Sequence, residues 1–176
     1  MQKYLKSPEN QNHSRESEVV LRAIARELGE DDDIWGIAGL LHDLDWEEIG
    51  TNYIEHGPRT IQILKEENFD IPENMAHAII SHNSEYTGVN RESKLDFALA
   101  AGESVTGLIY AYALMRPEKL AGMQASSLNK KFKDKSFAAK VSREAILEIE
   151  KIGMEKSKFF EIAIKAMQEI SAEIGF

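Results

Sequence analysis

Apolar residues recur at helical spacing in almost every part of the chain. Val20, Ala23, Ile24 and Leu28 follow the i, i+3, i+4, i+8 pattern of an amphipathic helix. Gly29 is expected to end this helix, because glycine is favoured just beyond a helix C-terminus. No segment shows sustained strict alternation of apolar and polar residues, which a half-buried strand would require. The pattern therefore predicts an all-α fold.

Acidic residues, glycines and prolines divide the rest of the chain into further helices. The acidic run 30–33 places negative charge at the start of a second helix, where the helix dipole favours it, and this helix is expected to end near His42-Asp43. The remaining helices are predicted from Gly57-Pro58 to about Asn68, from Pro72 through His82, over 93–115, over 139–152 and over 156–173. Residues 121–138 form the least regular region, which is locally basic.

The length of 176 residues is typical of one domain, and we expect a single helical domain over residues 1–176. Its core, over about 13–115, carries all the histidines, and the C-terminal helices of 116–176 are expected to pack on it. Several large apolar residues of the last helices are predicted to form either core or the face of a homodimer: Met154, Phe159, Phe160, Ile164 and Met167.

Composition excludes several classes of protein. The chain has no cysteine, so it has no disulfide framework, thiolate metal site or cysteine nucleophile. The formal charge of -9 argues against a general nucleic-acid-binding protein. The first ten residues are polar and unlike a signal peptide, and no apolar run approaches the roughly 20 residues of a membrane helix. We therefore expect no membrane partner and a cytoplasmic location.

Three histidines and one carboxylate fall on or beside apolar stripes of different predicted helices. They are His13, His42, His82 and Glu103. Taken singly, each histidine is more typical of a hydrogen-bonded core or helix-end residue than of a ligand. Together they predict a shared interior site, because buried charge is costly unless it is paired or bound to a metal.

The ordered set of His13, the doublet His42-Asp43, His56, His82 and Glu103 resembles the HD-domain superfamily of metal-dependent phosphohydrolases. The resemblance extends to the flanking residues and covers roughly 13 to 150. The segments that carry it are Trp35-Gly36-Ile37-Ala38-Gly39, Thr106-Gly107-Leu108-Ile109 and Lys131-Phe132-Lys133-Asp134-Lys135.

The resemblance implies a helical bundle that holds one or two divalent transition-metal ions (Fe, Mn, Co, Ni or Zn). The first ion would be held by His13, His42, Asp43 and Glu103. His56 and His82 match the extra histidines of members with two ions, which Asp43 would bridge. The family normally has Asp where this chain has Glu103, so the donor oxygens lie one methylene farther from the backbone.

Other residues are candidates for catalysis and substrate binding. We assign catalysis to Asp43 and Asp45; the latter would orient a histidine or the attacking water. Arg15, Lys131 and Lys133 are candidates for binding substrate phosphate. The last two belong to a basic cluster made up of Lys130, Lys131, Lys133, Lys135 and Lys140. His77 is predicted to have a surface or supporting role and Asp96 to lie on a helix surface.

The leading hypothesis is metal-dependent hydrolysis of a phosphate ester, with a nucleotide or a small phosphometabolite as substrate. Two alternatives stay open. Some HD-domain proteins are di-iron oxygenases, and the His/carboxylate set would suit that reaction. Others are signalling or ligand-binding modules without catalysis, and Glu103 keeps that function open for this chain.

Overall fold

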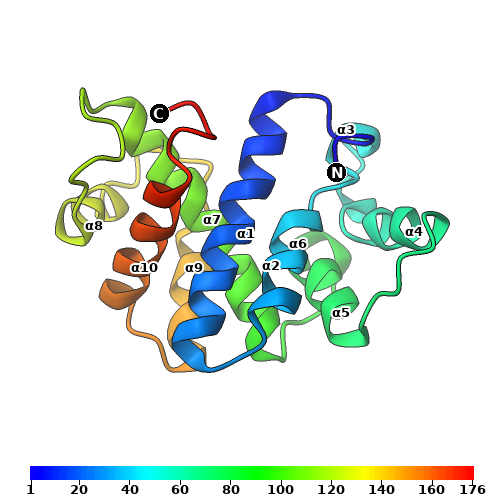
Figure 1. Cartoon of the computed structure of the whole chain (residues 1–176). Helices are drawn as coiled ribbons and strands as arrows, with labels where there is room; N and C mark the ends of the chain where they lie inside the picture. The colour runs from blue at the N-terminus through cyan, green and yellow to red at the C-terminus, as the bar shows by residue number, and fades with distance from the viewer.

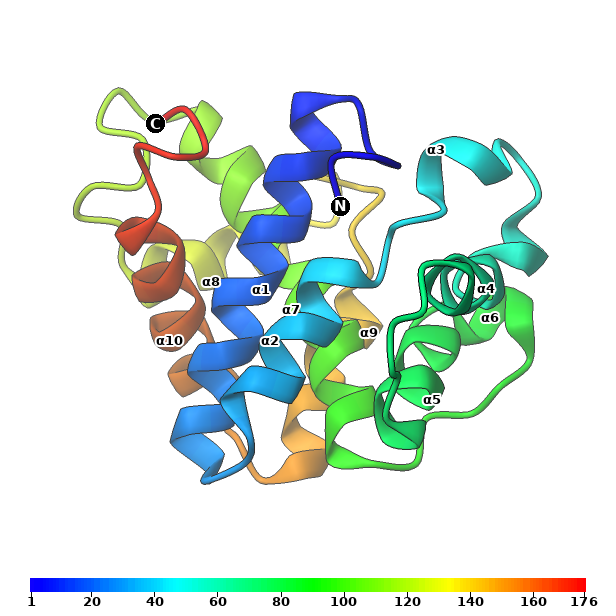
Figure 2. The same cartoon turned by 45° about the vertical axis from the view of Figure 1, so that its right-hand side comes forward.

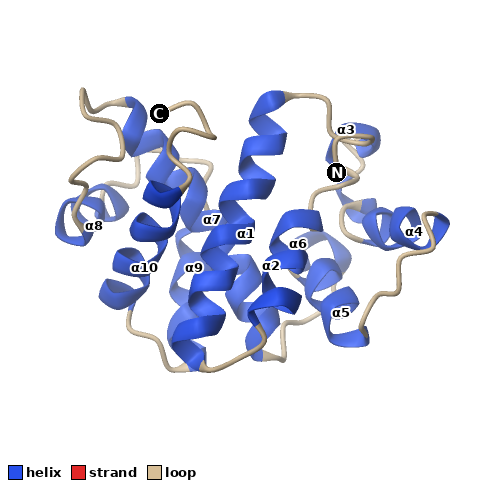
Figure 3. Cartoon of the chain, viewed as in Figure 1, coloured by secondary structure: helices blue, strands red, loops and turns tan.

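Two long helices, α1 (Pro8–Leu28) and α7 (Lys94–Leu114), pack against each other in the middle of the molecule (Figure 1). The computed structural model describes all residues 1–176 and contains helices and connecting segments but no strand (Figure 3). The prediction of an all-α fold is therefore confirmed. Gly29 ends the first helix in the left-handed conformation, with φ of 71°, as the sequence predicts.

Helix α2 (Asp32–Leu41) folds back along α1 and brings the His42-Asp43 doublet to the interior. As predicted, its N-terminus is acidic: the Asp31 carboxylate accepts hydrogen bonds from the N–H groups of Asp33 and Ile34. The two helices lie so close that a Cβ on Gly39 would stand 2.7 Å from the backbone oxygen of Ser17. Only glycine fits there, and this close approach fixes the position of the doublet.

Five short elements follow α2 and lie together on one side of the central helices (Figure 2). They are α3 (Trp46–Ile49), the 3₁₀ turn η1 (Tyr53–Glu55), α4 (Pro58–Glu66), α5 (Glu73–Ser81) and α6 (Ser84–Thr87). Helix α5 packs on α7 and carries Met75 and Ile79 into the core. The predicted third and fourth helices correspond to α4 and α5.

The C-terminal elements lie on the opposite side (Figure 1). They are α8 (Ala125–Lys133), α9 (Arg143–Leu147), the 3₁₀ helix η2 (Glu148–Ile152) and α10 (Lys156–Glu169). The five apolar residues for which core and dimer face were left open are all buried within the chain. They are therefore core, and the possible homodimer stays a prediction.

The structure corrects three local predictions. Region 121–138 contains a regular helix, α8. Its helical pattern is weak in the sequence because most of its residues are polar and only two, Leu128 and Phe132, are buried. The helix predicted over 139–152 begins later, at Arg143. Asp96 is fully buried rather than on a surface, since it caps α7 by accepting hydrogen bonds from the N–H groups of Glu92 and Ser93.

Helix α7 is long and apolar enough to cross a membrane by length and composition alone. The expectation that no apolar run approaches this length was therefore too strict. In this fold, however, 61% of its most apolar window is buried among the other helices, as in the core helix of a bundle.

Glu16 is an unusual buried acid on the inner face of α1. Its side chain is only 3% exposed, and its Oε1 has no hydrogen-bond partner in the protein. Burial disfavours the charged form and raises the pKa of Glu16 to about 8. The folded state therefore binds this proton more tightly than the unfolded state does, and folding stability should fall as pH rises from about 4.5 to about 8.

We predict that Glu16→Gln stabilises the protein at pH 9 more than at pH 5. At about 1.4 kcal/mol per pKa unit the difference amounts to a few kcal/mol, since the amide carries no charge to bury. Urea unfolding at both pH values measures it, with the exposed Glu27→Gln on the same helix as control. An equal effect of Glu16→Gln at both pH values would contradict a raised pKa.

Candidate metal centre

The His42-Asp43 doublet follows the last turn of α2 and lies at the centre of the site. The ring of His42 is only 1% exposed, and its Nδ1 donates to the backbone oxygen of Gly39 at 2.8 Å. This bond leaves the lone pair of Nε2 directed inward, 3.1 Å from Asp43 Oδ1 and without a hydrogen bond. A buried imidazole nitrogen without a hydrogen-bond partner, beside a carboxylate, is typical of a histidine that can bind a metal ion.

The other histidines of the predicted set are held in the same way. His56 Nδ1 is bound to Asp45 Oδ1 at 2.8 Å, and His82 Nδ1 to the backbone oxygen of Ile79 at 2.5 Å. The two Nε2 atoms lie 3.0 Å apart, and 3.3 and 3.8 Å respectively from Asp43 Oδ1. Both rings therefore face Asp43 with the nitrogen that a metal would use.

His13 enters from α1 on the other side of Asp43. Its Nδ1 lies 3.2 Å from the Thr106 hydroxyl, which itself donates to the backbone oxygen of Glu103 and so is free to accept from the ring. His13 Nε2 then points inward, 3.6 Å from Asp43 Oδ2. All four rings thus share one arrangement, in which Nδ1 is anchored by the protein and Nε2 converges on one carboxylate.

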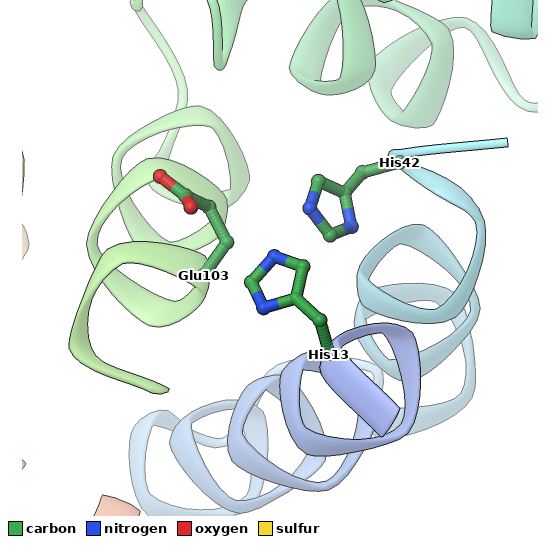
Figure 4. Close-up of side chains that lie close together, drawn as sticks. All are labelled: His13, His42 and Glu103. Atoms are coloured by element: carbon green, nitrogen blue, oxygen red, sulfur yellow. The ribbon is translucent and has the colours of Figure 1, made fainter. Parts of the chain in front are cut away.

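Glu103 reaches the same space from α7. Figure 4 shows its side chain on α7 across from the rings of His13 and His42, and ligand atoms of these three residues lie within 4.8 Å of one another. A second group with the same spacing consists of His42, Asp43 and His82. The side chain of Glu103 therefore lies close enough to His13 and His42 to share an ion with them, and its role as a ligand stays a prediction.

The charges of the site follow from this packing. Burial opposes ionisation of Asp43, but the surrounding imidazoles outweigh burial and hold its pKa well below the ordinary value. Burial raises the pKa of Glu103 and lowers that of His13 to about 4. Burial also opposes protonation of His56, yet its contacts with Asp43 and Asp45 raise its pKa to about 10. A cation held by these groups would compensate the buried carboxylates.

Asp45 supports the site from behind His56. It is fully buried and accepts hydrogen bonds from His56 Nδ1 and from the N–H groups of Gly57 and Thr60. The Thr60 hydroxyl in turn donates to the backbone oxygen of His42, which ties the two histidine segments together. Because Asp45 does not line the cavity, its position is that of a residue that orients His56 rather than one that touches substrate.

The site opens into a cavity of about 670 Å³. Of the predicted ligands, His13, Asp43, His56, His82 and Glu103 line it, whereas His42 lies beneath its floor. Residues that the sequence analysis did not assign to the site also line it: Asn10, Trp46, Tyr53, Asn83 and Tyr86. The sequence positions of two of them indicate that they lie near the ligands. Asn10 precedes His13 by three residues on one helix face, and Asn83 directly follows His82.

The three basic residues predicted to bind phosphate do not line this cavity. Arg15 forms ion pairs with Glu18 and Glu173, because two positions along a helix turn it about 200° away from His13. The ammonium of Lys131 lies over the rings of Tyr112 and Phe137.

Lys133 is exposed on α8 and does not reach the cavity either. Of the predicted basic cluster, the member that lines the cavity is Lys140. His77 lies apart from the ligand set, where its Nδ1 contacts the buried Asp96 at 3.0 Å.

The donor set fits a divalent transition metal. Imidazole nitrogens and carboxylate oxygens are the ligands that Zn, Fe, Mn, Co and Ni share, and every Nδ1 already has the supporting contact that metal-bound histidines usually show. His13, His42, Asp43 and Glu103 would hold one ion, and Asp43 with His56 and His82 a second.

We predict that Asp45→Asn weakens metal binding by 10- to 100-fold, since an amide N–H facing His56 Nδ1 would force the proton onto Nε2. Titration with Co²⁺, followed by visible absorbance, measures the affinity. Asp70→Asn, an exposed loop position, is the control. Unchanged affinity in Asp45→Asn would show that Asp45 does not orient His56.

Comparison with known proteins agrees with this geometry. The family model of the HD domain matches residues 10–113, a stretch that contains every member of the ligand set. Comparisons with curated proteins and with solved structures each found no match. HD domains bind divalent metals and form a superfamily of metal-dependent phosphohydrolases, although many members are not catalytic. The chain belongs to the HD domain family.

Proposed function

We propose that this protein hydrolyses a phosphate ester, with a nucleotide or a small phosphometabolite as substrate. The observation that carries the proposal is the convergence of four imidazole Nε2 atoms on Asp43, at the floor of an open cavity. A divalent ion bound there would lower the pKa of its water and polarise a phosphoryl oxygen. This chemistry requires no nucleophilic side chain, in agreement with a chain that has no cysteine.

The residues of the chain supply orientation and charge. Asp43 turns Oδ1 toward His42, His56 and His82 and Oδ2 toward His13, so each of its two oxygens could take part in holding an ion. The anchored Nδ1 atoms keep the rings fixed, which preserves the geometry during turnover. Substrate enters from the open side of the cavity, where Asn10, Asn83 and Lys140 offer polar contacts.

Lys140 is the cation that we assign to the substrate phosphate. It lines the cavity and forms no ion pair or hydrogen bond within the protein, so its ammonium is available. Arg143 holds the loop that carries it, because the guanidinium donates to four backbone oxygens, those of Asp134, Phe137, Ala138 and Val141. A loop fixed in this way supports a lysine directed at one place.

Metal-reconstituted protein should release inorganic phosphate from a panel of nucleotides and sugar phosphates. Activity should disappear in Asp43→Ala while far-ultraviolet circular dichroism stays helical, because the carboxylate lies at the point where all four imidazole Nε2 atoms converge. The same assay with an oxygen electrode distinguishes the alternatives. Oxygen consumption with iron bound, without phosphate release, would favour an oxygenase, and metal binding without turnover would favour a binding module.

Replacing Lys140 should weaken substrate binding. Lys140→Gln is expected to lower kcat/KM by roughly 10- to 100-fold, mainly through KM, since a charge-assisted hydrogen bond contributes about 1.5–3 kcal/mol. Steady-state kinetics measures this, with Lys135→Gln as the matched control from the same segment. Equal kinetics for the two variants would remove Lys140 from the substrate site.

A further inference from the structure

Three aromatic side chains line one side of the metal cavity and remain exposed. Trp46 on α3, Tyr53 on η1 and Tyr86 on α6 are 40%, 37% and 52% exposed. We call these three residues the aromatic wall. Large aromatic side chains gathered at the mouth of a cavity are unfavourable in water and typical of a binding surface.

The aromatic wall is continuous and adjoins the metal ligands. The ring centroids of Trp46 and Tyr53 lie 6.2 Å apart, and those of Tyr53 and Tyr86 lie 5.1 Å apart. At its inner end, Trp46 forms a T-shaped contact with His56, with a centroid separation of 5.1 Å. A group stacked on this wall would therefore lie directly beside the ligand set.

The wall has no evident role in folding. The three elements that carry it, α3, η1 and α6, contribute no buried residue to the core. Neither phenol hydroxyl nor the indole N–H forms a hydrogen bond within the protein, so these polar groups tie the three side chains to no other element. The backbone beneath is nevertheless fixed, because the Asn83 side chain donates to the backbone oxygen of Tyr53 at 2.8 Å and joins α6 to η1.

We propose that the aromatic wall binds a planar aromatic ring in the alcohol part of the substrate, while the phosphate faces Asp43, His56 and Lys140. This inference rests on the proposed hydrolysis of a phosphate ester and narrows its substrate class to esters that carry such a ring. Aromatic rings stack on one another through their π faces, a contact that a saturated ring of the same size does not reproduce. The wall thus selects for planarity at the part of the substrate that does not react.

Two esters that differ only in this property test the proposal: benzyl phosphate and cyclohexylmethyl phosphate. Both have a primary alcohol as leaving group, so their chemistry is matched. We expect the KM of benzyl phosphate to be lower by about tenfold, in line with the usual strength of stacking on aromatic side chains. In the double variant Tyr53→Leu/Tyr86→Leu the ratio of the two KM values should approach one. Phe69→Leu, an exposed aromatic outside the cavity, should keep the wild-type ratio.

A binding measurement tests whether the aromatic wall binds an aromatic ring, independently of turnover. The chain has two tryptophans, of which Trp35 is 3% exposed and Trp46 lies in the wall. Titration with 4-nitrobenzylphosphonate, which is not hydrolysed and quenches indole on contact, should quench Trp46 fluorescence in a saturable way. The double variant should bind at least about fivefold more weakly, and Trp46→Leu should lose the quenching.

The outcomes separate this inference from the proposed function. Equal KM values for the two esters in the wild type, or an unchanged ratio in the double variant, would overturn the aromatic-ring site while leaving phosphate hydrolysis intact. Hydrolysis of neither ester would count against the proposed function, and the fluorescence titration would then decide on the wall. Absence of saturable quenching would overturn the aromatic-ring site.

Discussion

The Asp43 carboxylate, surrounded by four imidazole rings in the interior of a helical bundle, is the constraint on which the structure depends. A charged carboxylate in a buried place is costly unless positive charge or hydrogen-bond donors compensate it. Here histidines on different elements turn Nε2 toward the carboxylate: His13 on α1, His42 after α2, and His56 and His82 after η1 and α5. The compensation would come from His56, whose pKa is raised, and from a cation bound among the rings. The chain must bring these elements together to place the rings around Asp43, so the same packing builds both the fold and the site.

Individual contacts in the fold hold the histidine segments in place around Asp43. Gly39 lets α2 approach α1 closely enough to place the doublet, and its own backbone oxygen then fixes the ring of His42. Asp45 and Thr60 join the segment after α2 to the start of α4. The mouth of the cavity differs from the ligand segments, because it is formed by short elements without buried residues and by a loop that Arg143 holds. Rigid support lies beneath the ligands, and the surfaces available to a substrate lie around them.

Much of the fold and the ligand set could be predicted from the sequence, because helical periodicity and helix-end residues mark both. His13, His42, His82 and Glu103 lie on or beside apolar stripes, and the HD resemblance supplied His56, which no periodicity indicates. The substrate side could not be predicted in the same way. Lys140 and the aromatic wall come from loops and short turns, whose side chains are positioned by contacts distant in sequence. Asp96 was misplaced because a buried capping carboxylate and an exposed one look alike in a sequence.

The central claim is that Asp43 and the histidines around it form a metal centre. Elemental analysis of protein purified without chelator, with Asp43→Ala purified in parallel, tests it most directly. The account predicts one or two divalent transition-metal ions per wild-type chain and their loss from the variant, while both proteins remain helical. A wild-type protein that holds no ion even after reconstitution with Mn, Fe, Co, Ni and Zn, or a variant that keeps the full complement, would contradict it.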